Sequence, residues 1–391
     1  MKPLVKWPGG KERVIKHIEP FFPIEFNNYI EPFLGGGAVY FYLEPQGNSF
    51  LNDININLVT FYRLIQENNE EFRNILLEIG NIWDNLDIYL NIDNELLSIY
   101  DRFRNEYITK EEAQQRISEI ILANTNFIQN FSILENHEQI FFRNLIDSIF
   151  NKFISLKNRL HKRLEENNLV DLEEELIEQI RTAKRAGFYY FMRNLLNRLN
   201  RNNNIELYIA TYIFVREFCF GSMFRYNKYG EFNIPYGGKA YNQKSFIKKV
   251  NYFFNPELSN LLQRAEIFNL DFREFLNQIE INENDFLFID PPYLSTFKDY
   301  EQNSFTEEDH IELANILRNI NTQYLLIIQH NDSVERIYGN LNANKIIVKS
   351  KYSYSARGRN KNDVDYIIFY NYTNIRQNQT ERVNYLQHNF L

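Results

Sequence analysis

Four short apolar runs near the C-terminus constrain the fold of this chain more than any other feature. Phe286–Ile289 and residues 324–328, 345–348 and 366–370 are rich in β-branched and aromatic residues, which predicts buried strands. The stretches between them carry apolar residues at helical spacing. Apolar strands that alternate with helices imply a parallel sheet covered on both faces. We therefore expect a doubly wound α/β fold.

A long segment without proline precedes these strands. Between residues 62 and 215, Ile, Leu and Phe recur at three- and four-residue spacing, and only two glycines occur, Gly80 and Gly187. This pattern is typical of helices. We expect an α/β domain made of residues 1–61 and 260–391. A mostly helical domain over residues 62–259, with a hairpin near 220–239, is inserted into it.

The composition excludes several kinds of site. The single cysteine, Cys219, rules out an intramolecular disulfide and a multi-cysteine zinc site, and the six histidines show no metal-ligand spacing. No run of about 18 apolar residues occurs, and the first residues lack the apolar stretch of a signal peptide. We expect a soluble, cytoplasmic protein without a metal and without a membrane partner.

The net charge of −8 argues at first sight against a nucleic-acid partner. However, residues 62–140 contain 6 Lys and Arg against 15 Asp and Glu, which accounts for the whole excess of negative charge. The rest of the chain is close to neutral and contains basic clusters. The net charge therefore says little about a binding face.

Asp290-Pro291-Pro292-Tyr293 ends the first of the four apolar runs. Ligands of an open α/β sheet bind just outside the carboxyl ends of its strands, so these residues are candidates for a site. A carboxylate and proline carbonyls form a cluster of acceptors beside an aromatic face. Such a cluster suits a planar amino group, such as the exocyclic nitrogen of adenine. The alternative is a strand followed by a proline turn without a function.

A second candidate is the glycine-rich turn within residues 31–38, Glu-Pro-Phe-Leu-Gly-Gly-Gly-Ala. Glycines allow a ligand to approach the backbone closely, and the helix expected after them offers free N–H groups. Asp53 follows at the end of the next expected strand, where an acidic side chain can bind ribose hydroxyls. The alternative is a plain loop with a helix cap.

The sequence Lys-Trp-Pro-Gly-Gly-Lys at residues 6–11 resembles a phosphate-binding P-loop only superficially. Val5 stands where the first glycine is needed, and Glu12 replaces the Ser or Thr that binds magnesium. We reject that interpretation. The turn, flanked by Trp7 and Lys11, could instead close over a flat, charged ligand.

Residues 220–239 mix basic, aromatic and turn-forming side chains. Residues 227–230 suggest a hairpin turn, and a two-stranded ribbon fits the major groove of DNA. Upstream lies a basic stretch with Tyr189 and Tyr190 among its members, which are Arg181, Lys184, Arg185, Arg193, Arg198 and Arg201. The alternatives are an ordinary surface hairpin and a solvated helix face.

Taken together, these segments resemble the Dam-type (α-class, D12) DNA N6-adenine methyltransferase family. The matching segments are KWPGGK at 6–11, EPFLGGGAV at 31–39, NDININL at 52–58, YYFMR at 189–193, FRYNKYGEFNIPYGGK at 224–239, DPPY at 290–293 and NSFTEEDHIELA at 303–314. The resemblance covers about residues 1–61 and 187–370. It implies a Rossmann-like methyltransferase fold with a helical target-recognition domain.

The resemblance also implies a cofactor, S-adenosylmethionine, which leaves as S-adenosylhomocysteine. Asp53 would hold its ribose, Trp7 and Lys11 would cover its methionine end, and Asp271 would approach its adenine. The full set of implied cofactor contacts is Trp7, Lys11, Glu31, Phe33, Gly35, Gly37, Asp53, Asp271 and Asp290.

For catalysis, the family resemblance implies direct methyl transfer at Asp290, Pro291, Pro292 and Tyr293. Asp290 and the Pro291 carbonyl would accept hydrogen bonds from the N6 amino group of an adenine flipped out of double-stranded DNA, and Tyr293 would stack on that base. The implied DNA contacts are Arg193, Phe220, Arg225, Asn227, Lys228, Glu231 and Asn233. A GATC-like site is the leading expectation.

The chain departs from the family pattern in three places. Residues 220–223 read Phe-Gly-Ser-Met, so the usual asparagine before the hairpin arginine is missing, and residues 329–332 read Gln-His-Asn-Asp. The block 70–186 has no clear counterpart in compact members, and we expect it to be a helical scaffold. It could instead clamp DNA, bind a partner protein or make a dimer contact.

Other functions stay open on the sequence alone. They are methylation of cytosine N4, methylation of adenine in RNA, and a non-catalytic DNA-binding subunit of a restriction-modification system. A cognate restriction endonuclease is a candidate partner, and the resemblance implies a bacterial or phage-encoded protein.

Overall fold

The computed structural model describes residues 1–165, 173–222, 225–293, 305–351 and 363–376. The chain divides into two compact units: Met1–Asn68 with Asn255–Leu391, and Asn69–Phe254. The limits between the units therefore fall after Asn68 and before Asn255, whereas the sequence analysis placed them after residue 61 and before residue 260.

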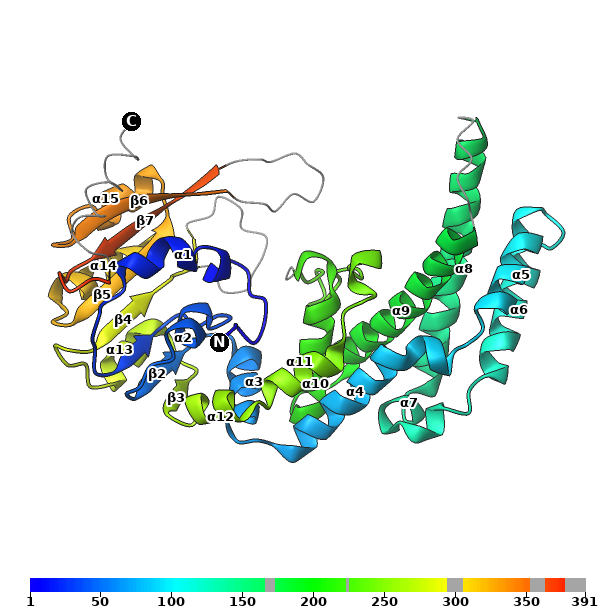
Figure 1. The fold of residues 1–391 in the computed structure, drawn as a ribbon, viewed down its shortest axis with the longest axis horizontal. Coiled ribbons are helices and arrows are strands. Elements are labelled where there is room, and N and C mark those ends of the chain that lie inside the picture. Colours follow the sequence, from blue (N-terminus) through cyan, green and yellow to red (C-terminus); the bar gives the residue numbers. More distant parts are fainter. Residues whose placement is uncertain (166–172, 223–224, 294–304, 352–362, 377–391) are drawn as a thin grey trace. The chain divides into compact units, whose positions relative to one another are not determined.

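The first unit is an α/β structure. Seven strands in its described residues form one sheet, in the order β3-β2-β1-β4-β5-β7-β6 (Figure 1). The strands are β1 (Tyr29–Glu31), β2 (Ser49–Asn52), β3 (Ala265–Phe268), β4 (Phe286–Ile289), β5 (Gln323–Gln329), β6 (Asn344–Lys351) and β7 (Asp363–Tyr370). The helices are α1 (Ile15–Ile18), α2 (Ala38–Leu43), α3 (Ile56–Gln66), α12 (Pro256–Leu262), α13 (Phe272–Gln278), α14 (Glu307–Asn319) and α15 (Asp332–Tyr338).

The direction of the strands confirms the doubly wound α/β fold, with one correction. Strands β1 to β5 pair in parallel, but β7 is antiparallel to both β5 and β6. The expectation of a parallel sheet is therefore wrong at β7. Strands β6 and β7 are consecutive in the chain and pair directly with each other, and parallel pairing of such strands would need a long crossover connection.

Strand β4 shows why its sequence is apolar at every position. Phe286 and Phe288 lie against Phe22 on one face, with ring centroids 6.2 Å and 6.4 Å apart. Leu287 and Ile289 belong to a buried cluster on the other face with residues of α13, α14 and α15. Because both faces are covered, the strand carries no polar alternation.

The order of the strands reverses between β1 and β4. In a doubly wound sheet this point leaves a crevice outside the carboxyl ends of the two strands, where ligands bind. Glu31 is the last residue of β1, and Asp290 directly follows β4. The fold therefore brings two carboxylates from distant parts of the sequence to the same edge of the sheet.

The second unit is helical. Its helices are α4 (Glu70–Tyr89), α5 (Asp93–Arg104), α6 (Lys110–Ala123), α7 (Ser132–Glu135), α8 (Glu138–Glu165), α9 (Glu173–Arg198), α10 (Ile205–Phe218) and α11 (Phe246–Phe253). Helix α9 packs against α8 and α10, and Trp83 of α4 lies among the rings of Phe214, Phe218 and Tyr236. After α10, the bridges Cys219–Tyr236 and Tyr226–Phe232 form the expected hairpin.

No helix in the described ranges is long and apolar enough to cross a membrane.

Candidate active site and nucleic-acid interface

Lys11 holds the carboxylate of Asp290. Its side chain is only 2% exposed, and its Nζ donates to Asp290 Oδ1 at 2.5 Å and Oδ2 at 2.6 Å. The same ammonium group donates to the Tyr293 hydroxyl and to the Gly9 carbonyl, both at 2.9 Å. The structure thus places Lys11 at the Asp-Pro-Pro-Tyr segment, and its contact with the methionine end of a cofactor stays a prediction.

Two opposing effects act on the pKa of Asp290. Burial raises the pKa of Asp290, and the charge and hydrogen bonds of Lys11 oppose this rise. Pro291 is buried and Pro292 is exposed. Lys11 also lies over the rings of Tyr293 and Tyr366, with its Nζ 5.1 Å and 5.5 Å from the two centroids.

Glu31 is the second buried carboxylate of this edge. It accepts a hydrogen bond of 2.8 Å from the Tyr29 hydroxyl. Burial raises the pKa of Glu31 most, and the charges of Asp290 and Asp53 raise it further. These three carboxylates are therefore close enough to interact electrostatically, which makes this edge attractive to a cation.

Asp53 ties the glycine-rich turn to the end of β2. Its Oδ2 accepts from the Gly35 N–H and its Oδ1 from the Asn55 N–H, both at 2.8 Å. Burial raises the pKa of Asp53, and these two backbone donors lower it. Each carboxylate oxygen has a further lone pair, so the group can still accept from a hydroxyl.

Glycine is required at two positions of this turn. Gly35 and Gly37 have φ angles of +50° and +66°, which side chains rarely adopt. A Cβ at Gly35 would lie 2.9 Å from the Trp7 ring, and one at Gly37 would lie 2.7 Å from the Phe41 ring. Trp7 therefore lies against the turn, and its contact with a cofactor stays a prediction.

Asn52 is a structural residue of the site that sequence reasoning missed. Its Nδ2 donates to the carbonyls of Pro32 and Leu270, both at 3.0 Å, and its Oδ1 accepts from the Leu270 N–H at 2.9 Å. One amide thus joins the segments that follow β1 and β3. The signal in the sequence was a polar residue ending the apolar run before Asp53.

Two other expected cofactor contacts have partners within the chain. Phe33 packs against Phe272 and Phe305, with both centroid distances at 5.5 Å. Asp271 caps α13 by accepting from the Arg273 N–H at 2.9 Å, and it also pairs with the Arg273 guanidinium at 3.0 Å. Contact of these two residues with a cofactor stays a prediction.

In the part of the chain that the structure describes, no group of three or more His, Cys, Asp or Glu side chains could hold a metal ion.

In the hairpin of the helical unit, Asn227 and Glu231 build the turn. The Asn227 Oδ1 accepts from the backbone N–H groups of Tyr229 at 2.9 Å and Glu231 at 3.0 Å, and its Nδ2 donates to Glu231 Oε2 at 2.8 Å. Gly230 supplies a φ of +78°. The side chain of Asn227 is therefore engaged in the turn, and its contact with DNA stays a prediction.

Arg225 is oriented by Asn233 on the opposite strand of the hairpin. Its Nε donates to Asn233 Oδ1 at 3.0 Å, and the Asn233 N–H donates to the Arg225 carbonyl at 3.2 Å. Arg225 is exposed, so its two terminal nitrogens can form the bidentate pair that recognises guanine. Lys228 lies over the ring of Tyr229, which is 75% exposed at the turn.

Phe220 is 38% exposed at the base of the hairpin, so its ring can still reach a base stack. Met223, the last residue of the departure from the family pattern, lies outside the described residues.

Part of the basic stretch on α9 is buried in the helical unit. Lys184 is fully buried and pairs with Asp87 and Asp93, and Arg185 is buried beside Asp87. Arg193 donates to the Ile234 carbonyl at 3.2 Å and lies over the Tyr190 ring. These three side chains have partners within the unit, whereas Arg198 is exposed. Contact of Arg193 with DNA stays a prediction.

A doubly wound sheet of this order defines a Rossmann-like methyltransferase fold, and Asp-Pro-Pro-Tyr lies at its switch point. The family model of the D12 class N6 adenine-specific DNA methyltransferase matches residues 7–141 and 149–354. The chain belongs to this family. It is a site-specific DNA methyltransferase that acts on adenine. The match runs through most of the block 70–186, so the resemblance extends further than the sequence analysis found.

Known relatives align with more than half of this chain. The type II methyltransferase M.CviBI of Paramecium bursaria Chlorella virus NC1A is 24% identical over 340 residues, which cover 86% of this chain and 86% of the viral protein. The type II methyltransferase M.MjaIII of Methanocaldococcus jannaschii is 24% identical over 364 residues, covering 89% and 92%. The DNA adenine methylase of Salmonella typhi is 26% identical over 235 residues, covering 58% and 79%.

Proposed function

We propose that the crevice at the ends of β1 and β4 binds S-adenosylmethionine and presents its methyl group to an adenine flipped out of duplex DNA. The observation that carries this proposal is the cluster of three carboxyl groups at one edge of the sheet, of which Glu31 and Asp53 are buried and Asp290 is partly buried. Lys11 pairs with Asp290, and Glu31 and Asp53 add further carboxyl oxygens beside this pair. The cofactor carries a positive sulfonium and an ammonium group, so the cluster fits it electrostatically.

The glycine-rich turn supports the same cofactor. Gly35 and Gly37 give the turn its positive φ angles and its close contacts with Trp7 and Phe41, and Asp53 keeps acceptor capacity for ribose hydroxyls. Trp7 covers the turn. When bound, S-adenosylmethionine supplies an electrophilic methyl group.

The chain itself would position the adenine. The Asp290 carboxylate and the Pro291 carbonyl would accept hydrogen bonds from the N6 amino group, which directs the nitrogen lone pair along the line of transfer. Lys11 stabilises the ionised form of Asp290 in this buried setting. Because burial raises the pKa of Asp290, the carboxylate is also suited to take the proton that N6 loses.

The decisive variant is Asp290→Ala. It should abolish methyl transfer from labelled cofactor to DNA while cofactor binding, measured by calorimetry, stays within about tenfold of the parent. Turnover that survives this change would refute the catalytic assignment. A loss of both activities, with unchanged folding, would instead move Asp290 into the cofactor site.

We propose further that the helical unit is the target-recognition domain and that its hairpin reads a GATC-like site through Arg225. Support comes from the exposed Arg225, fixed by Asn233, and from the likeness of residues 224–239 to the family pattern. Expression in a host without DNA methylation, followed by modification-sensitive sequencing, would report the site. A recognition sequence that contains no guanine would count against Arg225 as its reader. Two relatives are named type II methyltransferases, which supports a restriction endonuclease as a partner.

A further inference from the structure

The hairpin of the helical unit is supported by one face of α9. Tyr189, Arg193 and Asn197 follow each other at four-residue spacing, so their side chains project from the same side of the helix. All three donate to the returning strand of the hairpin. We call these three residues the hairpin ladder.

The contacts of the hairpin ladder are made to backbone groups. The Tyr189 hydroxyl donates to the Ile234 carbonyl at 2.9 Å, and Arg193 Nη1 donates to the same carbonyl at 3.2 Å. Asn197 makes a reciprocal pair with Phe232: its Nδ2 donates to the Phe232 carbonyl at 3.0 Å, and its Oδ1 accepts from the Phe232 N–H at 2.9 Å. The Asn197 amide thus satisfies the backbone N–H and C=O of Phe232, as the backbone of a neighbouring strand would.

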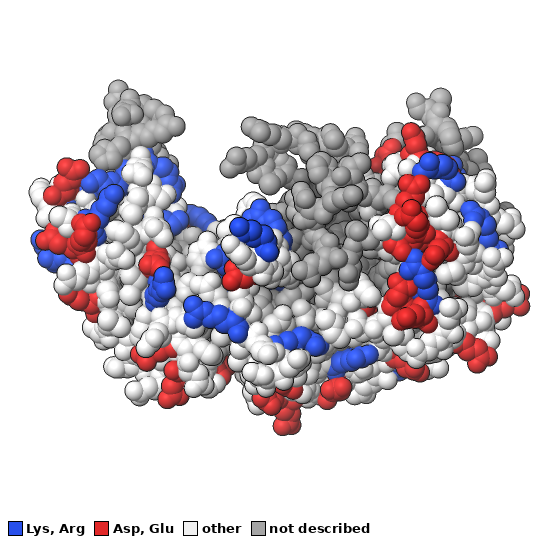
Figure 2. All heavy atoms as spheres, turned by 180° about the vertical axis from the view of Figure 1, so that it is seen from behind, with Lys and Arg blue, Asp and Glu red and all other residues white. Residues whose placement is uncertain are grey.

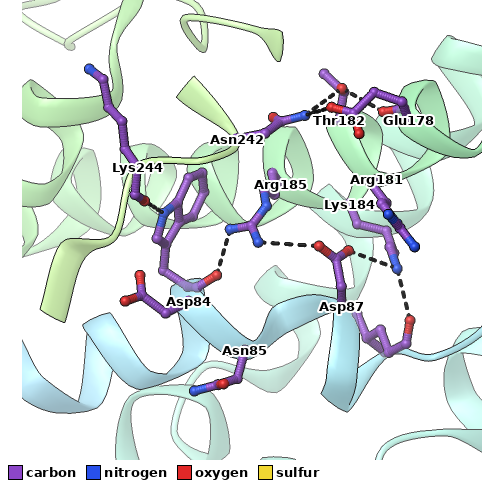
Figure 3. A network of polar contacts seen from close by, with 12 residues as sticks. Asp84, Asn85, Asp87, Glu178, Arg181, Thr182, Lys184, Arg185, Asn242 and Lys244 are labelled. Carbon is purple, nitrogen blue, oxygen red and sulfur yellow. Dashed lines mark hydrogen bonds and ion pairs between the residues drawn. The ribbon is translucent and has the colours of Figure 1, made fainter. Parts of the chain in front are cut away.

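The segment after the hairpin is held by the same helix. Asn242 donates to Glu178 Oε1 and to Thr182 Oγ1, both at 2.8 Å, and accepts from the Tyr236 hydroxyl at 2.9 Å. Figure 3 shows Asn242 beside Glu178 and Thr182 of α9. Helix α9 therefore holds the returning strand at two positions and the chain that leaves it at a third.

Helix α9 is itself fixed by buried charges. Lys184 pairs with Asp87 at 2.9 Å (Figure 3). It also pairs with Asp93 at 2.6 Å and donates to the Leu90 carbonyl at 2.9 Å. Arg185 donates to the Trp83 carbonyl at 2.6 Å. A buried ammonium group is tolerated only while its partners are in place, so a turn or slide of α9 would leave this charge unpaired.

One link connects the hairpin ladder to the reading side chain. Asn197 binds both backbone groups of Phe232, and Phe232 immediately precedes Asn233. Asn233 in turn orients Arg225 by accepting a hydrogen bond from the Nε of the arginine. A displacement at Phe232 therefore moves Asn233 Oδ1, the acceptor that orients the Arg225 side chain. The exposed guanidinium has no other described contact that would keep its direction.

We propose that Asn197, with Tyr189 and Arg193, positions the hairpin for sequence discrimination, so that these are specificity-determining residues that do not read a base themselves. This inference rests on the proposed role of the hairpin as the DNA reader. The hairpin ladder acts on the choice between sites, whereas binding of the cofactor and transfer within the first unit depend on other residues.

The test compares Asn197→Ala with Asn194→Ala. Asn194 is the same residue type on the same helix and is also half-buried, but its Nδ2 donates to Asn144 Oδ1 at 2.7 Å, and it makes no hydrogen bond to the described residues of the hairpin. Methylation rates are measured on the recognition site, once it is known from sequencing, and on sites with one base changed. The ratio of these rates is the discrimination.

Asn197→Ala should reduce discrimination about tenfold, because a good bidentate contact discriminates by roughly 5- to 150-fold. Asn194→Ala should leave discrimination within about twofold, and both variants should keep the cofactor affinity of the parent. Unchanged discrimination in Asn197→Ala, or an equal loss in Asn194→Ala, would overturn the proposal. If Asn197→Ala does not fold, Tyr189→Phe removes a single hydroxyl, and its discrimination relative to the parent decides the matter in the same way.

Arg225→Ala, assayed in parallel, separates this inference from the proposed function. If Arg225→Ala keeps full discrimination, the hairpin is not the reader and the proposed DNA contact fails. If Arg225→Ala loses discrimination and Asn197→Ala does not, the hairpin reads DNA but the hairpin ladder does not position it for discrimination.

Discussion

Replacement of Lys11 by methionine tests the electrostatic design of the site. The ammonium group is 2% exposed and contacts both oxygens of Asp290, which is 18% exposed. Removing one partner of a buried pair leaves an uncompensated charge and costs about 3–5 kcal/mol of stability. Urea unfolding should show a loss of this size in Lys11→Met unless Asp290 takes up a proton, which limits the cost.

The same variant should change the pH dependence of methyl transfer. Burial already raises the pKa of Asp290, and Lys11 opposes that rise. Without Lys11 the pKa rises further, so the ionised carboxylate forms only at higher pH. The acid limb of kcat against pH should therefore move upward, and activity at pH 6 should fall more than activity at pH 8.

A double variant separates the pair from its parts. Lys11→Met combined with Asp290→Asn removes both charges, so its stability loss should be smaller than the sum of the two single losses by about 1–3 kcal/mol. Stability losses that simply add, together with an unshifted pH profile for Lys11→Met, would show that Lys11 does not control the charge of Asp290.

Three further predictions follow from single contacts. Gly37→Ala forces a side chain into a φ of +66° and against Phe41, so cofactor affinity measured by calorimetry should fall at least about tenfold, with about 1–3 kcal/mol of stability lost. Asn52→Ala leaves backbone groups of the site unpaired and should cost about 3 kcal/mol in urea unfolding. His310 of α14 is buried, and burial lowers its pKa from 6.5 to about 4. The neutral imidazole therefore contributes to the stability of the folded state above pH 6.5, and this stability is lost as the pH falls from 6.5 to about 4. His310→Gln should therefore reduce the acid-induced loss of stability between pH 7.5 and pH 4 by about 3 kcal/mol, measured by urea unfolding at both values.

The sequence predicted most of the strands and the place of the candidate site because these depend on local patterns. The apolar run Phe286–Ile289 encodes a strand that is buried on both faces, and the prolines after Asp290 end it. The antiparallel direction of β7 was not predictable, because an apolar run looks the same in either direction. Strand direction follows from the connection before it.

Contacts between distant residues explain what the sequence missed. Lys11 and Asp290 are 279 positions apart, and nothing near Lys11 indicates that its partner is a carboxylate in another segment. The burial of Lys184 was hidden for the same reason. A lysine among other charges predicts a solvated helix face, and only Asp87 and Asp93, on another part of the helical unit, make its burial tolerable.

The chain acts on DNA although its net charge is −8, so the affinity for DNA must come from basic side chains at the binding face and not from the net charge. Lys, Arg, Asp and Glu are interspersed over the described part of the face drawn in Figure 2, and several carboxylates are already paired within the chain. In the hairpin, Asn233 orients the planar guanidinium of Arg225, whose two terminal nitrogens suit the edge of a base. Lys228 is an exposed point charge, which suits a phosphate.

Lys228→Ala should therefore weaken binding to all sequences alike and reduce the slope of log K against log salt by about 0.9. Arg225→Ala should reduce discrimination and leave that slope nearly unchanged. Affinities measured between about 50 mM and 200 mM salt on matched and altered sites decide this, and a reversed pattern would exchange the two roles.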